Sequence, residues 1–87
     1  MKIKIALCDD DAKALPIIAG AAESAFAEKG ISAEITRFRS GEALLRATED
    51  THFQLLLLDI EMPGMDGIAV GKRLRERGDS TPLVYVS

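Results

Sequence analysis

The sequence predicts a three-layer α/β domain, in which helices cover both faces of a parallel sheet. Two observations support this prediction. Short apolar runs of strand length alternate with stretches in which apolar residues recur at helical spacing, in the order βαβαβαβ. In addition, the run at residues 53–60 is largely continuous in its apolar character, which is typical of a parallel strand that is buried on both faces.

The N-terminal pattern predicts a strand followed by a helix. A short apolar run, made of Ile3, Ile5, Ala6 and Leu7, leads into three consecutive aspartates. Apolar residues then recur at helical spacing from Leu15 to Phe26, and Gly30 stands where a helix would stop. Pro16 falls early in this stretch. Because proline is tolerated only in a first helical turn, we expect the regular helix to start late or to bend there.

A second strand and a short helix come next. Residues 31–38 alternate in polarity and predict the strand. Ser40 can cap a helix, and the residues at 42–45 are good helix formers. Residues 48–52 are polar and predict a connection outside the helix.

The remaining sequence predicts a strand, a loop, a helix and a last strand. The strand covers residues 53–60, and the loop at 61–67 contains two glycines and one proline. The third helix is expected over residues 68–77 and is stopped by Gly78. Residues 83–86 then form a fourth apolar strand.

Right-handed crossovers limit the topology of such a chain. If the second and third strands lie on opposite sides of the first, the strand order is 2-1-3-4. The first helix then covers one face of the sheet, and the second and third helices cover the other. The chain changes direction at the first strand. In open sheets of this kind, ligands bind at the carboxyl ends of the strands beside that switch point.

The composition excludes several classes of protein. A length of 87 residues suits one small domain, and a net charge of −3 argues against a nucleic-acid-binding module. The basic residues between Lys72 and Arg77 are interpreted as a solvated helix face. The single cysteine, Cys8, excludes an intrachain disulfide and is expected to be buried. Neither a signal peptide nor a membrane span is expected, so the predicted location is cytoplasmic.

Three carboxylates are expected to meet at one edge of the sheet. Asp9 and Asp10 follow the first strand, and Asp59 ends the neighbouring third strand. Carboxylates that lie so close together repel one another, and a hard divalent cation relieves that repulsion. Mg²⁺ prefers oxygen ligands and leaves positions open for a phosphate. The pattern therefore predicts an Mg²⁺ site in which one carboxylate acts as a nucleophile.

Each acidic feature taken alone has a simpler explanation. Acidic residues favour helix N-termini, so the aspartates at 9–11 are explained by the start of the first helix, with Asp11 in a capping role. Asp59 alone is explained as an ordinary residue of a turn after a strand. Their expected meeting at adjacent strand ends is what favours the functional interpretation.

Two segments resemble one known family. Residues 56–67, with the sequence LLLDIEMPGMDG, resemble the phosphoacceptor signature of response-regulator receiver domains, and residues 6–11, ALCDDD, resemble their acidic pair. The resemblance extends over the whole chain, 1–87, and implies a flavodoxin-like fold. Within that family, the Cys-Asp-Asp-Asp form, with Phe38, Ser40 and Gly41 after the second strand, is similar to receivers of the LytTR-type regulators.

The resemblance implies a role for each matching position. Asp59 would accept a phosphoryl group from a histidine kinase. Asp10 would bind Mg²⁺ directly and Asp9 would act largely through water. Asp59 itself and the backbone carbonyl of Glu61 would be further ligands. Ser87 matches the hydroxyl switch residue at the end of the fourth strand. The implied function is a signalling switch and not an enzyme, with DNA binding left to a separate output domain.

The chain also departs from the family pattern. Receivers have five βα units, whereas this sequence stops at the fourth strand and has neither the fifth unit nor its lysine. We therefore expect a truncated domain whose exposed fourth strand, at 83–86, pairs with another copy. One alternative is an interaction module without efficient phosphotransfer. Another is a phosphatase with an aspartate nucleophile, but such enzymes place a second aspartate where this sequence has Glu61.

Overall fold

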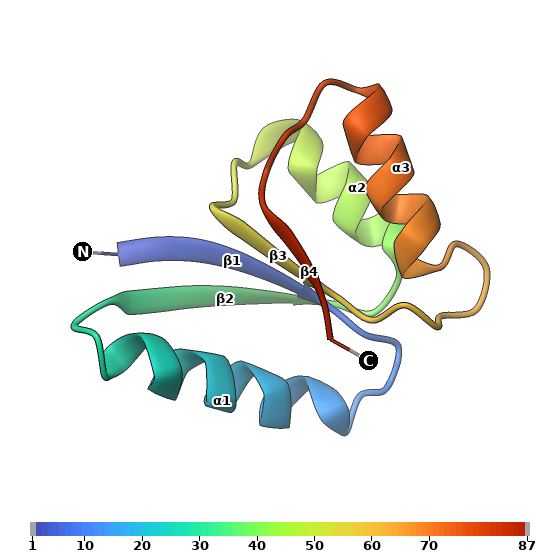
Figure 1. Cartoon of the computed structure of the whole chain (residues 1–87). Coiled ribbons are helices and arrows are strands. Elements are labelled where there is room, and N and C mark those ends of the chain that lie inside the picture. Colours follow the sequence, from blue (N-terminus) through green and yellow to red (C-terminus); the bar gives the residue numbers. More distant parts are fainter. Residues whose placement is uncertain (1, 87) are drawn as a thin grey trace.

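A computed structural model of the chain describes residues 2–86 and shows three layers (Figure 1). The chain forms a four-stranded parallel sheet in the order β2-β1-β3-β4, as predicted. Helix α1 lies against one face of the sheet, and α2 and α3 lie together against the other (Figure 1). The elements in chain order are β1 (Lys2–Cys8), α1 (Ala14–Ala27), β2 (Ser32–Phe38), α2 (Gly41–Asp50), β3 (Leu55–Leu58), α3 (Gly67–Glu76) and β4 (Leu83–Tyr85).

The side chains of the central strands alternate between two hydrophobic cores. Leu56 and Leu58 point to the α2 and α3 side, where they pack in a cluster with Leu44 and Leu74. Leu57 points to the opposite side and packs in the cluster that α1 covers. This division explains the run of leucines in β3, because a strand covered on both faces has no solvent-facing side.

Two elements differ clearly from their predicted bounds, α2 and β3. Helix α2 continues to Asp50, so most of the predicted connection at 48–52 is helical. Its last turn is polar because it faces solvent, and the Thr48 hydroxyl donates a hydrogen bond to the Leu45 carbonyl. Strand β3 is shorter than the predicted 53–60. Phe53 precedes the strand and packs edge-on against the Phe38 ring, with the ring centroids 6.2 Å apart.

The three helices differ in how side chains cap their first N–H groups. Asp66 caps α3, since its carboxylate accepts a hydrogen bond from the Ala69 N–H at 2.8 Å. Ser40 caps α2 as predicted, through the Ala43 N–H. Helix α1 starts at Ala14 without a side-chain cap. Asp11 instead accepts from the Lys13 N–H, one residue before the helix, so the predicted capping role is only partly right.

The basic residues of α3 make local contacts. The guanidinium of Arg77 donates to the Leu45 carbonyl and thereby ties the end of α3 to α2. Arg75 donates to the Asp79 carbonyl, and Arg73 lies 4.0 Å from the carboxylate of Glu76. These contacts support the interpretation of the basic cluster as a helix surface. Within residues 2–86, none of the helices has both the length and the apolar character that crossing a bilayer requires.

Candidate functional site

The parallel register brings three carboxylates together at the carboxyl edge of the sheet. β1 pairs with β3 so that Cys8 lies beside Leu58, and the residues that follow each strand are therefore neighbours. In the described part of the chain, carboxylate oxygens of Asp9, Asp10 and Asp59 lie within 4.8 Å of one another. The site thus lies at the carboxyl ends of β1 and β3, beside the strand at which the chain changes direction, as the topology predicts.

Backbone hydrogen bonds hold the phosphoacceptor candidate and its acidic neighbour. The Asp59 N–H donates to the Cys8 carbonyl at 2.9 Å, and the Asp9 N–H donates to the Phe38 carbonyl at 3.1 Å. The side chain of Asp59 accepts from the Glu61 N–H at 3.3 Å. The side chain of Asp9 accepts from the Asp11 N–H at 2.9 Å. Both carboxylates are therefore oriented by the loops that follow their own strands.

The electrostatics of the site favour a bound cation. Burial raises the pKa of the Asp9 carboxyl, and the negative charges of Asp59 and Asp10 raise it further, against the opposing effect of the hydrogen bond from Asp11. Asp9 and Asp59 are both buried, while Asp10 is half-buried. Carboxylates gathered at one place are the donor set that a hard divalent cation stabilises. The residues present therefore fit a metal of the Mg²⁺ type.

Cys8 is excluded as a reactive thiol at this site. It is fully buried, and desolvation together with the charges of Asp9 and Asp59 raises its pKa to about 12. Because the thiolate is the form that attacks or binds metal, a thiol that stays protonated does neither. Its Sγ instead lies 3.5 Å from the Sδ of Met62, in the core beneath the acidic residues. The sequence-based expectation that Cys8 is buried is thus confirmed.

The loop between β3 and α3 contains features that the sequence pattern did not reveal. A Cβ built on Gly67 would lie 2.3 Å from the carbonyl oxygen of Asp59, so only glycine fits where α3 begins. Gly64 has a φ of +73°, a left-handed conformation that glycine adopts without strain. The motif contained both glycines, but only the backbone geometry shows that Gly67 lets the helix approach the candidate phosphoacceptor.

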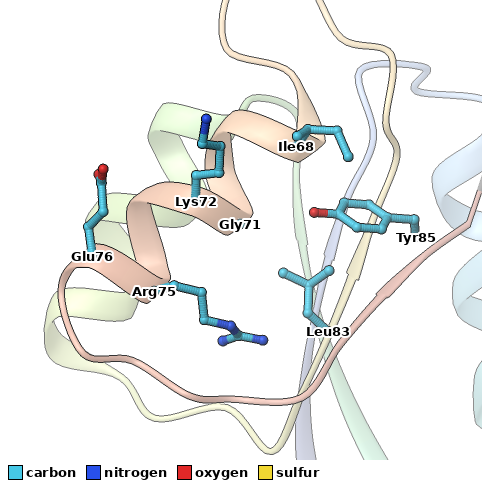
Figure 2. A pocket seen from close by; sticks show the side chains of 7 residues that line it. All are labelled: Ile68, Gly71, Lys72, Arg75, Glu76, Leu83 and Tyr85. Atoms are coloured by element: carbon cyan, nitrogen blue, oxygen red, sulfur yellow. The ribbon is translucent and has the colours of Figure 1, made fainter.

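Two hollows lie near α3. The smaller, of about 400 Å³, borders the loop after β3 and is lined by Ile60, Glu61, Met62, Pro63 and Asp66. The larger, of about 480 Å³, lies between α3 and β4 (Figure 2). There the Tyr85 hydroxyl points toward Gly71, while Lys72 and Arg75 lie along the rim (Figure 2). Neither hollow is lined by the three clustered aspartates.

The remaining predicted site residues have less support. Glu61 lies next to the cluster through its N–H, but the role of its backbone carbonyl stays a prediction. Ser87 lies outside the described residues, so its predicted role as a hydroxyl switch also stays a prediction.

The fold and the acidic edge together define a class of protein: a small flavodoxin-like α/β domain with a carboxylate cluster that fits a metal ion at its topological switch point. Residues 5–87 match the model of the response regulator receiver domain. The chain belongs to this family, as the sequence motifs predicted. The LytTR-type subdivision stays a prediction.

Similar proteins of known function are transcription regulators. The chain is 35% identical over 81 residues to the DNA-binding transcriptional regulator NtrC of Klebsiella pneumoniae, covering 93% of this chain and 16% of that protein. It is 33% identical over 85 residues to the transcriptional regulatory protein CiaR of Streptococcus pneumoniae, covering 98% of this chain and 35% of that protein. The chain therefore spans a minor part of the length of these relatives.

Solved structures agree with the family. The receiver domain of a Francisella response regulator is 29% identical with a TM-score of 0.70, and the match covers 95% of this chain and 64% of that one. A complex of the histidine kinase ThkA with the response regulator TrrA contains a chain that is 27% identical, with a TM-score of 0.69. That match covers 98% of this chain and 67% of the other.

Proposed function

We propose that this chain, residues 1–87, is a phosphoacceptor receiver module, in which Asp59 takes a phosphoryl group from a histidine kinase with the help of Mg²⁺. The observation that carries this proposal is the convergence of Asp9, Asp10 and Asp59 within 4.8 Å at the switch point of the sheet. The family match and the similarity to a kinase-bound regulator complex support the choice of donor.

Asp59 is the carboxylate best placed to accept the group. It directly follows a buried strand, and its Oδ1 is oriented by the Glu61 N–H. In the proposed transfer, a carboxylate oxygen of Asp59 forms a bond to phosphorus while the bond from phosphorus to the kinase histidine nitrogen breaks. Such transfers depend mainly on positioning and on charge stabilisation, and the backbone contacts of Asp59 supply the positioning.

The other site residues would prepare the pocket for the incoming group. Asp10 would hold Mg²⁺ directly, with Asp59 itself and the Glu61 carbonyl as further ligands, and Asp9 would hold it largely through water. The bound metal supplies positive charge that offsets the negative charge of the phosphoryl group. Asp9 and Asp10 leave the pocket too negative for a phosphoryl group on their own, and we therefore expect acceptance to require the metal.

The proposed role is that of a switch and not of an enzyme with turnover. The similar transcription regulators are much longer than this chain, so DNA binding would belong to another domain. A kinase donor also places the proposed chemistry in the cytoplasm, where ATP is available to that kinase.

An acyl-phosphate donor gives a direct test that needs no kinase. We expect the chain to gain the mass of one phosphoryl group when it is incubated with a small acyl phosphate and Mg²⁺, and to gain none when a chelator is present. Intact mass spectrometry measures the adduct, and fragmentation assigns it to a residue. An adduct formed equally well without metal would contradict the proposed metal role, and multiple turnover of the donor would favour a phosphatase.

A folded chain that forms no adduct would favour the alternative, an interaction module that self-associates. One observation favours that alternative. β4 is one of the two edge strands of the described sheet. Val84 and Tyr85 are exposed on it and Val86 is exposed just after it, beside the hollow that borders α3 (Figure 2). An uncovered apolar edge strand can pair with another copy of itself.

The kinase must bring its phosphohistidine to Asp59, so its docking surface must border the acidic edge of the sheet. Helix α1 starts directly after the acidic segment and carries Ile17, which is 72% exposed, in its first turn. Gly20 and Ala21, one turn later, are also exposed and small. This outward face is apolar although it is exposed to solvent, and such faces mark interaction sites. We assign it to the kinase.

The test uses a histidine kinase that phosphorylates the wild type. With that kinase, Ile17→Ala is expected to slow phosphotransfer about tenfold, as for a contact worth about 1.4 kcal/mol. Its reaction with acyl phosphate is expected to stay unchanged, since the pocket is intact. The matched control is Ile68→Ala, the same change at an exposed position on α3, across the sheet. Loss of transfer in the control, with normal transfer in Ile17→Ala, would place the docking surface on the other face.

A further inference from the structure

Cys8 holds the segment after β3 at two points. Its backbone carbonyl accepts the Asp59 N–H at 2.9 Å. Its thiol donates to the thioether of Met62, with 3.5 Å between Sγ and Sδ. Both sulfur atoms belong to one buried cluster on the α2 and α3 side, where Cys8 is fully buried and Met62 is 8% exposed. The four residues from Asp59 to Met62 are therefore fastened to the end of β1 at their first and last positions.

Glu61 lies between these two attachments. Its N–H donates to the Asp59 carboxylate, and its carbonyl belongs to the peptide unit that joins it to Met62. Because a peptide unit is planar and rigid, the position of the Met62 backbone helps to set the direction of the Glu61 carbonyl. The Met62 side chain anchors that backbone in the core.

Methionine alone is a poor anchor. Its side chain is unbranched and flexible, so it fills irregular gaps in several rotamers. A directional contact to its sulfur selects one of these rotamers. The thiol of Cys8 is a weak donor, but in the buried cluster it has no water to compete for it.

We propose that Cys8 and Met62 are positioning residues, which act through the Glu61 carbonyl to preorganise the metal pocket. The inference rests on the proposed function, because it takes that carbonyl as an Mg²⁺ ligand. Neither side chain touches the metal or the phosphoryl group. Their contribution is a loop that already has its metal-binding conformation before the cation arrives.

A purely structural role and a positioning role predict different results. If the two residues only fill space, their substitution lowers stability and leaves Mg²⁺ affinity unchanged. If they position the loop, metal affinity falls more than the loss of core volume explains. The matched control is therefore Val70→Ala, which removes apolar volume from the same buried cluster but leaves the sulfur contact in place.

The test uses Cys8→Ala, Met62→Leu, the double variant and Val70→Ala. We expect the Mg²⁺ dissociation constant, measured by calorimetry, to rise about tenfold in either single variant, the lower end for outer-shell partners of metal ligands. The double variant should bind Mg²⁺ no more weakly than the weaker-binding single variant, since the two single substitutions remove the same contact. Val70→Ala should bind Mg²⁺ like the wild type.

A second readout needs no metal. Amide hydrogen exchange at Glu61 and Met62 should be faster in both single variants than in Val70→Ala, because the loop is released. Unchanged exchange, or equal effects in the control, would overturn the inference. If the wild type binds no Mg²⁺, the proposed function fails while the exchange data still decide whether the pair holds the loop. If the wild type binds Mg²⁺ and both variants retain its affinity, only this inference fails.

Discussion

Asp59→Asn is expected to abolish the phosphoryl adduct and, without metal, to make the folded chain more stable. The first effect follows because an amide does not act as the nucleophile. The second follows because Asp59 is one of three carboxylates within 4.8 Å, so the change removes like-charge repulsion from the folded state. Partly screened charges at such distances interact by on the order of 1 kcal/mol or more, and we expect a stabilisation of that order.

Intact mass spectrometry measures the adduct, and urea unfolding in the presence of a chelator measures the stability. Asp66→Asn is the matched control. It makes the same substitution in the loop after β3, and asparagine caps a helix as well as aspartate does. The control should keep both the adduct and the wild-type stability. An adduct that persists in Asp59→Asn would move the phosphoacceptor to another residue, and a less stable variant would mean that the three charges do not repel significantly.

Gly67→Ala is expected to lower the free energy of unfolding by about 3 kcal/mol, near the upper end for overpacking a well-packed site. The new methyl group would lie 2.3 Å from the Asp59 carbonyl oxygen and 3.1 Å from the Ile60 Cα. Both neighbours are backbone atoms, and the Gly67 N–H is already bonded to the Ile60 carbonyl, so neither side can move without loss. A domain of this size has little stability to spare, and a large part of the variant should be unfolded.

A second glycine provides a control for the change from glycine to alanine. Gly20 lies inside α1, and a Cβ built there meets no atom within 4 Å. Gly20→Ala should therefore raise stability by roughly 0.5–1 kcal/mol, because alanine favours the helix. Urea unfolding followed by circular dichroism measures both variants. If Gly67→Ala unfolds within 0.5 kcal/mol of the wild type, the close approach of α3 to Asp59 is wrong.

Much of the fold was predictable because the pattern that specifies it is local. The leucines of β3 and the glycine after α3 indicate the alternation of elements, and right-handed crossovers leave few topologies. The ends of elements were less predictable. The polar last turn of α2, up to Asp50, resembles a loop in sequence, and only its contacts with Leu45 show that it continues the helix.

The acidic residues could be found from sequence because strand ends that follow buried runs must meet at one edge of a parallel sheet. The residues that support them could not be found in the same way. The contact between Cys8 and Met62 joins residues 54 positions apart, and neither sulfur belongs to the acidic pattern. The tight fit of Gly67 against Asp59 depends on the path of the backbone, which the sequence motif alone does not reveal.

The pairing of β1 with β3 also has a kinetic consequence. Asp9 and Asp59 become neighbours only when the chain closes a loop of about fifty residues, whereas the β1–β2 and β3–β4 pairs join shorter segments. Closing that longer loop costs more conformational entropy than closing the shorter ones. The same step brings three negative charges into one pocket. The conformational search is thus opposed by electrostatics at the moment when the pocket forms, and a cation that screens those charges would also speed the folding of the domain.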